Sequence, residues 1–332
     1  MDQTLQFYGG RRQRSLSLTG LLLLALMACL LLGSNAVHAG NAASANNGGV
    51  QGADYWRQVT QGEQGYSTHK KAESGVLINR SGEEWRQLRI QQIQPYGIWA
   101  LAGIVLLLAA VYLLAGPSKL EQPRSGSTLE RWTKLDRYLH WAVAGLFIIL
   151  TLTGLSLLYG RYFLPEVMGK SGFANYIQLA KSTHNYLGVL FALCLTLMIL
   201  KWIKNNIPRL IDLDWFLQGG GMIKGKHPHA GYMNGGEKLW FWVLVAAGIV
   251  LSLSGLVLDF PLYTSELRND LQLATVLHAI SALILICGTL AHAYIGSIGT
   301  EGALEGMVTG QVDETWAKQH HDLWHQDLTD KK

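Results

Sequence analysis

Residues 277–294 read LHAISALILICGTLAHAY, an apolar run without Asp, Glu, Lys or Arg. Within it lie two histidines, His278 and His292. On an α-helix their separation is about four turns, a rise of about 21 Å, and the second side chain returns to within about 40° of the direction of the first. The two histidines therefore share one face of one predicted helix at two depths. Ionisable side chains inside a membrane helix indicate a functional site.

Four further windows also lack these charged residues for long enough to cross a hydrocarbon layer of about 30 Å, which takes about 20 helical residues. With the first run at its full length, the five windows are Tyr96–Leu114, Leu139–Leu158, His184–Leu200, Leu239–Leu258 and Leu273–Ile298. None alternates like a barrel strand, so helices are predicted. The predicted fold class is an all-α membrane protein.

The composition agrees with a membrane protein, because 49% of the 332 residues are hydrophobic and 15% are charged, where about a quarter charged is usual in soluble chains. The net charge of +4 is small, and the basic residues lie between the apolar windows, which argues against nucleic-acid binding. Cys29, Cys194 and Cys287 all lie in apolar runs without CxxC or CxxCH spacing. A disulfide framework, an iron–sulfur site and covalently attached haem therefore lack ligands, and metal chemistry must fall to histidine or carboxylates.

The N-terminal segment (1–39) is typical of a cleaved export signal, with an uncleaved anchor as the alternative. Arg11, Arg12 and Arg14 precede the apolar run Leu21–Leu32, and small residues follow at the positions a signal peptidase reads, Val37 and Ala39. The sequence then divides into a polar, periplasmic segment (40–95), an extra transmembrane helix with its linker (96–120), a four-helix domain (121–300) and a cytoplasmic tail (301–332).

Basic residues in the short loops predict the orientation. One side carries eleven, which are Lys119, Arg124, Arg131, Lys134, Arg137, Lys201, Lys204, Arg209, Lys224, Lys226 and Lys238. The other side carries four, which are Arg161, Lys170, Lys181 and Arg268. The side with eleven is predicted to be cytoplasmic. This agrees with an exported mature N-terminus, and it places a multi-pass chain in a bacterial inner membrane with its C-terminus inside.

Four histidines lie inside or at the ends of the predicted spans: His140, His184, His278 and His292. The topology puts two at each depth. Two neutral imidazoles that face each other across a bundle can hold both axial positions of a haem iron, which suits electron transfer. We therefore predict two b-type haems, a cytoplasmic one on His140 and His292 and a periplasmic one on His184 and His278.

The alternative is a haem-free membrane protein, with four histidines hydrogen-bonded in a bundle or forming the proton relay of a transporter. A relay usually recruits mid-span Asp or Glu, which these windows lack. Five glycines leave room for a flat macrocycle, although glycine in membrane helices also serves helix packing. They are Gly145, Gly154, Gly188, Gly248 and Gly255.

Residues 225–242, GKHPHAGYMNGGEKLWFW, contain a turn signal directly before the fourth window. Asn234 with Gly235 and Gly236 would place an amide and exposed backbone N–H groups beside the cytoplasmic haem, where they could bind a quinone carbonyl. A plain helix-entry turn is the other interpretation. In the tail, His320, His321 and His325 with Trp316 and Trp324 predict an amphipathic surface segment.

At these residues the sequence resembles the gamma subunit, cytochrome b556, of respiratory formate dehydrogenase. The resemblance covers roughly 130–326 and is carried by five ordered motifs. They are LDRYLHW (135–141), THNYLG (183–188), YMNGGEKLWFW (232–242), LHA through AHAY (277–294) and EGMVTGQVDETWAKQHH (305–321). The wider dihaem cytochrome b family includes the b subunits of nickel–iron hydrogenases.

The resemblance implies a four-helix dihaem cytochrome b bundle plus one additional N-terminal transmembrane helix. It implies the four histidines as haem ligands, and menaquinone or ubiquinone near Asn234, the neighbouring glycines and His292. It also implies an iron–sulfur beta subunit and a molybdenum or tungsten pterin alpha subunit that oxidises formate, with a trimer of heterotrimers as the larger assembly known in the family. This chain would anchor the complex in membrane lipid and hold no formate site. A hydrogenase or another periplasmic oxidoreductase is the alternative partner.

Overall fold

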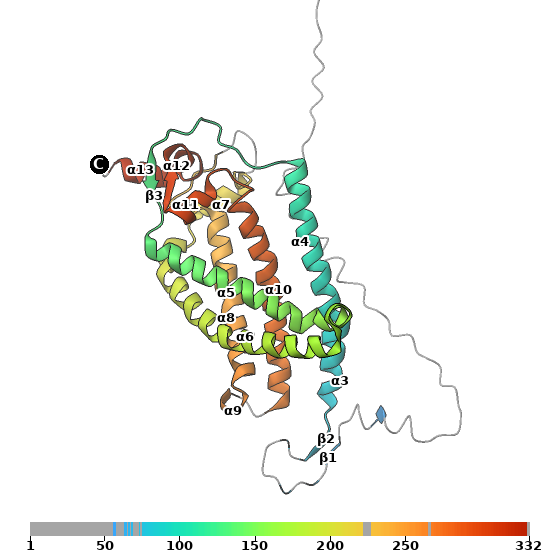
Figure 1. Cartoon of the computed structure of the whole chain (residues 1–332). Coiled ribbons are helices and arrows are strands. Elements are labelled where there is room, and N and C mark those ends of the chain that lie inside the picture. Colours follow the sequence, from blue (N-terminus) through green and yellow to red (C-terminus); the bar gives the residue numbers. More distant parts are fainter. Residues whose placement is uncertain are drawn as a thin grey trace, which may run out of the picture.

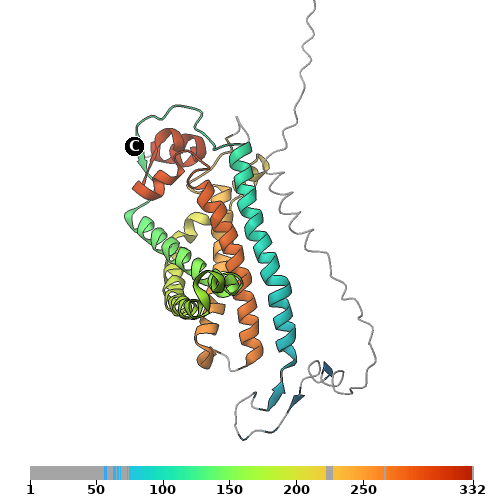
Figure 2. The same ribbon diagram turned by 45° about the vertical axis from the view of Figure 1, so that its right-hand side comes forward.

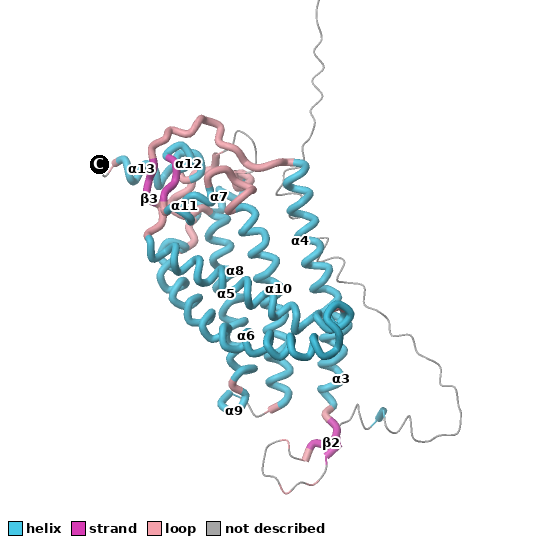
Figure 3. Tube along the Cα trace, viewed as in Figure 1, coloured by secondary structure: helices cyan, strands magenta, loops and turns pink. Residues whose placement is uncertain are grey.

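The computed structural model describes residues 56–57, 63–64, 66, 68, 73, 75–221, 227–264 and 267–330. The predicted export signal and most of the predicted periplasmic segment lie outside these residues. The described part is mostly helical (Figure 3). Five of its helices are long and apolar enough to cross a membrane, which confirms the predicted fold class.

The five long helices match the five predicted windows, although the last window, Leu273–Ile298, runs three residues past the end of its helix. They are α4 (Gln94–Leu114), α5 (Lys134–Tyr159), α6 (Leu164–Trp202), α8 (Gly235–Asp259) and α10 (Arg268–Ile295). Each begins before its charge-free window. Helix α5 begins early because it has a capping box: Thr133 and Asp136 accept hydrogen bonds from each other's backbone N–H groups. This stabilises a polar first turn ahead of the apolar window. Helix α6 begins far ahead of its window at His184, and Gly169 interrupts it at φ 72°, a conformation that glycine adopts without steric cost.

The bundle consists of two helix pairs and one added helix. Helices α5 and α6 pack along each other and cross the pair formed by α8 and α10 (Figure 1). Helix α4 runs beside α10 (Figure 2), and it is continuous with α3 (Arg80–Gln87) and the π-helical η1 (Leu88–Ile93). The main apolar core lies between the pairs and includes Phe191, Leu195 and Leu285. The added helix is thus packed on the outside of the bundle.

Gln94 docks helix α4 on the end of α5. Its side chain is buried, and its Nε2 donates to the Leu158 carbonyl at 2.9 Å. The Tyr159 hydroxyl donates to the Gln94 carbonyl at 3.0 Å, and the Tyr162 hydroxyl donates to its Oε1 at 2.7 Å. One turn on, a Cβ added at Gly97 would lie 2.3 Å from the Tyr159 hydroxyl. The close approach of the two helices therefore requires glycine at 97.

Replacing Gly97 with valine is expected to destabilise the chain by about 1–3 kcal/mol, because overpacking forces the helices apart. Gly103→Val is the matched control, since none of the described residues comes within 4 Å of a Cβ at Gly103. Thermal unfolding of both variants in detergent checks this. Equal midpoints would contradict the packing of α4 described above.

A small end cap closes the bundle at the end where α5 begins. It contains two antiparallel strands, β3 (Thr128–Glu130) and β4 (Gln311–Asp313), and three short helices, α11 (Ala303–Thr309), α12 (Glu314–His320) and α13 (Asp322–Thr329). Helix α7 (Leu210–Leu217) lies at the same end (Figure 1). The remaining short elements are β1 (Glu63–Gln64), β2 (Val76–Ile78), η2 (Gly160–Tyr162), η3 (Ile203–Asn206) and α9 (Pro261–Thr264).

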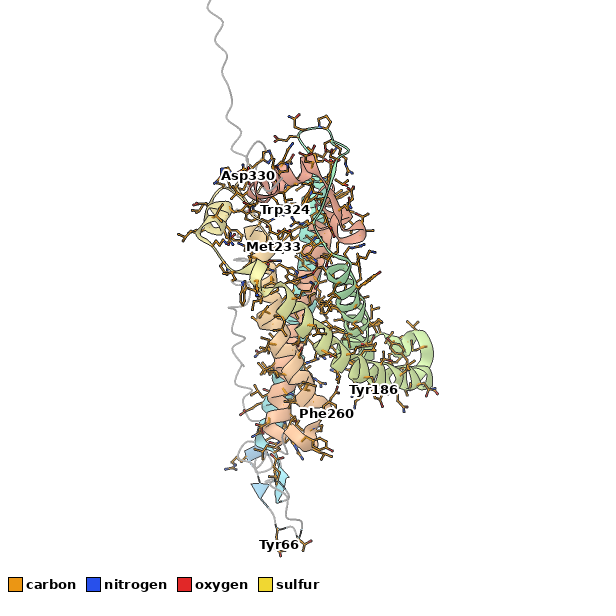
Figure 4. The ribbon with its side chains drawn as sticks, turned by 90° about the vertical axis from the view of Figure 1, so that its left-hand side faces the viewer. Tyr66, Tyr186, Met233, Phe260, Trp324 and Asp330 are labelled. Carbon is orange, nitrogen blue, oxygen red and sulfur yellow. The ribbon has the colours of Figure 1, made fainter. Side chains whose placement is uncertain are left out.

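The prediction of an amphipathic surface tail is wrong. Trp316, Trp324 and His321 are 6%, 7% and 1% exposed. The first two form an apolar cluster with Val312 that Tyr232 also joins. Trp324 and Met233 lie at the same end of the molecule, opposite Phe260 (Figure 4). The tail is buried because segments from much earlier in the chain, such as the one that contains Tyr232, cover it.

Candidate functional site

The structure brings the four histidines together as two facing pairs. The rings of His140 on α5 and His292 on α10 have centres 6.2 Å apart. The rings of His184 on α6 and His278 on α10 have centres 6.0 Å apart. We call these the end-cap pair and the distal pair. Because α10 supplies one ring to each, the pairs lie about 21 Å apart along its axis.

The distal pair is held through its Nδ1 atoms. The Nδ1 of His184 lies 2.9 Å from the hydroxyl of Thr153 on α5. The Nδ1 of His278 lies 3.0 Å from the carbonyl of Leu251 and 3.3 Å from the hydroxyl of Ser254, both on α8. A ring that donates through Nδ1 keeps the lone pair on Nε2, the nitrogen then available to a metal.

The end-cap pair is set by indole rings instead. The His292 ring stacks on Trp240 at 5.6 Å between centres and 18° between planes. The His140 ring stacks on Trp202 at 6.4 Å and 25°. The Nδ1 of His140 is buried, and no described residue provides it with a hydrogen-bond partner. The two pairs therefore have different surroundings, polar at the distal pair and aromatic at the end-cap pair.

Both separations fit a metal held between two imidazoles. A metal–nitrogen bond of about 2 Å and a ring nitrogen about 1 Å from its own ring centre put the two centres about 6 Å apart. In the described part of the chain no three His, Cys, Asp or Glu side chains group as metal ligands. Two ligands per site suit haem, whose macrocycle supplies the other iron ligands.

The glycines serve two purposes. A Cβ at Gly154 or Gly255 would lie 3.1 Å from the Cε1 of His184 or His278, so each glycine makes room for a distal ring. Gly248 instead packs on Leu195 at 2.8 Å. Gly188 lies about one turn after His184, and no described residue lies within 4 Å of a Cβ added there, so this space fits a macrocycle beside the distal pair. Gly145 is equally open, but it lies five residues after His140 and therefore about 140° around α5 from it.

Asn234 begins helix α8. Its Oδ1 accepts from the backbone N–H of Glu237 at 2.9 Å, and Glu237 Oε2 accepts from the backbone N–H of Asn234 at 2.8 Å. This capping box uses the amide oxygen and leaves the Nδ2 group as the donor. Trp240, which stacks on His292, follows less than two turns later, a rise of about 9 Å. The turn therefore lies beside the end-cap pair.

Gly235 and Gly236 have a packing role that the sequence did not reveal. Trp215 of α7 lies against both, 3.0 Å from a Cβ at Gly235 and 2.9 Å from one at Gly236. The Lys238 ammonium donates to both carboxylate oxygens of Asp212 at 2.8 Å. Helix α7 therefore packs against the Asn234 turn and is held there by the Lys238–Asp212 ion pair. Trp215 was not predicted from the sequence to belong to this site.

Arg131, one of the eleven basic loop residues, joins the end cap to the Asn234 turn. Its side chain is 2% exposed, and its Nη2 donates to Glu237 Oε1 at 3.0 Å. Four aromatic rings lie 5.0 to 5.6 Å from its guanidinium, those of Trp132, Tyr232, Trp316 and Trp324. Burial lowers the pKa of the neighbouring His321 well below its ordinary value, so that ring is neutral and does not compete with Arg131 for Glu237.

Comparison with known proteins finds several similar proteins, among them the following three. The nitrate-inducible formate dehydrogenase cytochrome b556(Fdn) subunit of Escherichia coli (strain K12) is 27% identical over 198 residues, 58% of this chain and 88% of that protein. The cytochrome b556(fdo) subunit of the same strain is 27% identical over 211 residues, 62% and 97% respectively. The formate dehydrogenase cytochrome b556 subunit of Haemophilus influenzae is 28% identical over 197 residues, 58% and 79%.

The model of the prokaryotic cytochrome b561 family matches residues 131–310, more than half of the 332 residues. The match begins at the buried Arg131, spans the two helix pairs and ends at Gly310, before β4. It includes all four paired histidines. The chain therefore belongs to the prokaryotic cytochrome b561 family of haem-b-binding, all-helical membrane proteins.

Proposed function

We propose that this chain is the membrane-anchoring dihaem cytochrome b subunit of a respiratory formate dehydrogenase. In this role it carries electrons from a periplasmic iron–sulfur beta subunit across the inner membrane to menaquinone or ubiquinone. A molybdenum or tungsten pterin alpha subunit would oxidise formate, and three such heterotrimers could associate. The observation that carries the proposal is the pair of facing imidazole pairs, with ring centres 6.2 and 6.0 Å apart, at two depths. The names of the three relatives support formate dehydrogenase as the enzyme.

The orientation supports a direction of transfer. The end cap and the Asn234 turn lie on the side that carries eleven loop Lys and Arg residues, which the positive-inside rule assigns to the cytoplasm. The distal pair then lies toward the periplasm, where the partner docks. Haem b, when bound, would supply one-electron iron chemistry at each histidine pair, which suits electron transfer.

The chain's own residues would do the rest. His184 with His278, and His140 with His292, would hold the two haems. At the turn, the Nδ2 of Asn234 would donate to a quinone carbonyl, and the cytoplasmic position would let the quinone take protons from that side. Helix α7, with Trp215 seated on Gly235 and Gly236, would fix the backbone there and limit the space around the quinone head group.

A haem count on the purified chain or complex tests the proposal. A pyridine haemochrome assay with a dithionite-reduced minus oxidised spectrum is expected to give two b haems per chain and a bis-histidine spectrum. A colourless protein would refute the haem assignment and favour the alternative, in which the histidines serve helix packing or the proton relay of a transporter. Co-purification separates the partners, since an iron–sulfur subunit with a pterin subunit indicates formate dehydrogenase and a nickel–iron subunit indicates a hydrogenase.

At Asn234, the helix cap and the proposed quinone contact can be separated. Both Asn234→Ala and Asn234→Ser are expected to keep two haems and to slow quinone reduction about five- to thirtyfold, because each removes a hydrogen bond worth about 1–2 kcal/mol. Serine restores the cap, whose loss in the alanine variant costs about 1 kcal/mol. Quinone reduction by the complex, measured with reduced partner, checks this. Full turnover in the serine variant would mean that Asn234 acts only as a cap.

A further inference from the structure

The distal histidines lie in two copies of one short motif on different helices. Residues 150–154 of α5 read LTLTG, and residues 251–255 of α8 read LSLSG. In each copy the glycine makes room for a histidine ring and the preceding hydroxyl residue meets its Nδ1. The leucine carbonyl of each copy faces the same ring, Leu150 for His184 and Leu251 for His278. The two helix pairs thus present the same cradle to the distal site.

The direction of these hydrogen bonds follows from the hydroxyl protons. The Thr153 hydroxyl donates to the backbone carbonyl of Ile149 at 2.9 Å, with Leu150 a second acceptor at 3.2 Å. The Ser254 hydroxyl likewise donates to the carbonyl of Val250 at 2.6 Å. Each hydroxyl has one proton, which is used in this way, so its lone pairs accept from the imidazole N–H. Both distal rings are therefore Nδ1–H tautomers with Nε2 free.

The end-cap pair lacks such a cradle. The positions that correspond to His140 and Trp141 in the second helix pair, in the register that aligns the two motif copies, hold Phe241 and Trp242. The repeat therefore does not extend to this depth. The Nδ1 of His140 is buried, and the described residues offer it no acceptor. The two sites therefore differ in the hydrogen bonding of their imidazole rings. The Nδ1 atoms of His184 and His278 have hydrogen-bond partners, whereas the Nδ1 of His140 has none among the described residues.

We propose that Thr153 and Ser254 are positioning residues that act with the Leu150 and Leu251 carbonyls to fix the tautomer of the distal histidines and make the distal haem the lower-potential haem of the two. This inference rests on the proposed function. An acceptor on the N–H of a metal-bound imidazole orients the ring and raises its basicity, and a more basic ligand stabilises the ferric over the ferrous state. The end-cap haem, whose ligand His140 has no such acceptor among the described residues, then has the higher potential. Electrons pass downhill from the distal to the end-cap site.

A redox titration of the intact complex, or of the full chain in detergent, tests this inference. Thr153→Val and Ser254→Ala are expected to raise the midpoint potential of one haem and leave the other unchanged. For a one-electron couple, a tenfold change in the ratio of oxidised to reduced haem corresponds to a shift of about 59 mV in the midpoint potential. We expect Thr153→Val to raise the potential by up to this amount. Thr153→Ser, which keeps the hydroxyl, should restore the wild-type value. The electron paramagnetic resonance signal of the same haem should shift with its potential.

Ser281→Ala is the matched control. The Ser281 hydroxyl, one turn from His278, donates to the Leu277 carbonyl and is buried, yet within the described residues it contacts no histidine ring nitrogen. If Ser281→Ala shifts the potential as much as Ser254→Ala, or if neither cradle variant shifts it, the inference is wrong. If Thr153→Val fails to bind haem, the potential of Ser254→Ala tests the inference instead. In that variant the Leu251 carbonyl still accepts from the Nδ1–H of His278 and keeps the ring in place. A wild-type chain without two haems would instead overturn the proposed function.

Discussion

Replacing His278 with alanine is expected to leave one haem per chain instead of two. In the proposed assignment His184 and His278 would be the two side-chain ligands of the distal haem, and a single remaining histidine would not retain it. The end-cap pair lies about four turns along α10 from His278, so its haem should persist. Under the proposed function, electron entry from the iron–sulfur partner should also stop, since the remaining haem would lie on the far side of the membrane. A pyridine haemochrome count on the purified variant measures the loss.

Two further variants make this result specific. His140→Ala should remove the other haem and leave the distal one, so the two variants together should account for both absorption bands. His325→Ala is the control, because His325 contacts Glu314 in the end cap at 3.1 Å and belongs to neither pair. A full count of two haems in His278→Ala would refute the ligand assignment. A loss in His325→Ala as large as in His278→Ala would show that haem content reports only general stability.

The helices and the pairing of the histidines could be predicted because both depend on local patterns. A charge-free run of about 20 residues identifies a span, and the helical rise then gives the depth of each histidine. The polar first turns could not be predicted in this way, since the capping residues of α5 and α8 lie outside the apolar windows. For the same reason the window at His184 showed only the second half of α6.

Contacts between distant segments could not be predicted from one sequence. Trp215 reads as an ordinary residue of a loop, and its packing on Gly235 and Gly236 depends on how α7 folds back. Trp316 and Trp324 show amphipathic spacing, but the tail was predicted to lie on the surface because nothing in the sequence pairs it with Arg131, which precedes the second predicted span. The spacing of apolar residues shows that one face of the tail is apolar. It does not show which distant segment of the chain covers that face.

Replacing Arg131 with methionine is expected to release the end cap. Methionine keeps much of the apolar stem but leaves the Glu237 carboxylate without its cation and the four rings without a cation–π partner. Breaking a fully buried pair costs about 3–5 kcal/mol. Because the Glu237 side chain is 33% exposed, solvent screens part of this, and we expect about 2–3 kcal/mol. Thermal unfolding and limited proteolysis of residues 303–329 measure it.

Arg124→Met is the control for this substitution. Arg124 also binds the end cap, through Glu305 at 2.6 Å, but its side chain is 44% exposed, so its loss should cost about 1 kcal/mol or less. A double-mutant cycle with Glu237→Gln isolates the pair, and a coupling energy near zero, or equal effects of the two arginine variants, would contradict the anchoring role. Because Glu237 also closes the cap of Asn234, Arg131→Met should slow quinone reduction while both haems remain. The buried arginine thus couples the docking of the tail to the geometry of the proposed quinone site.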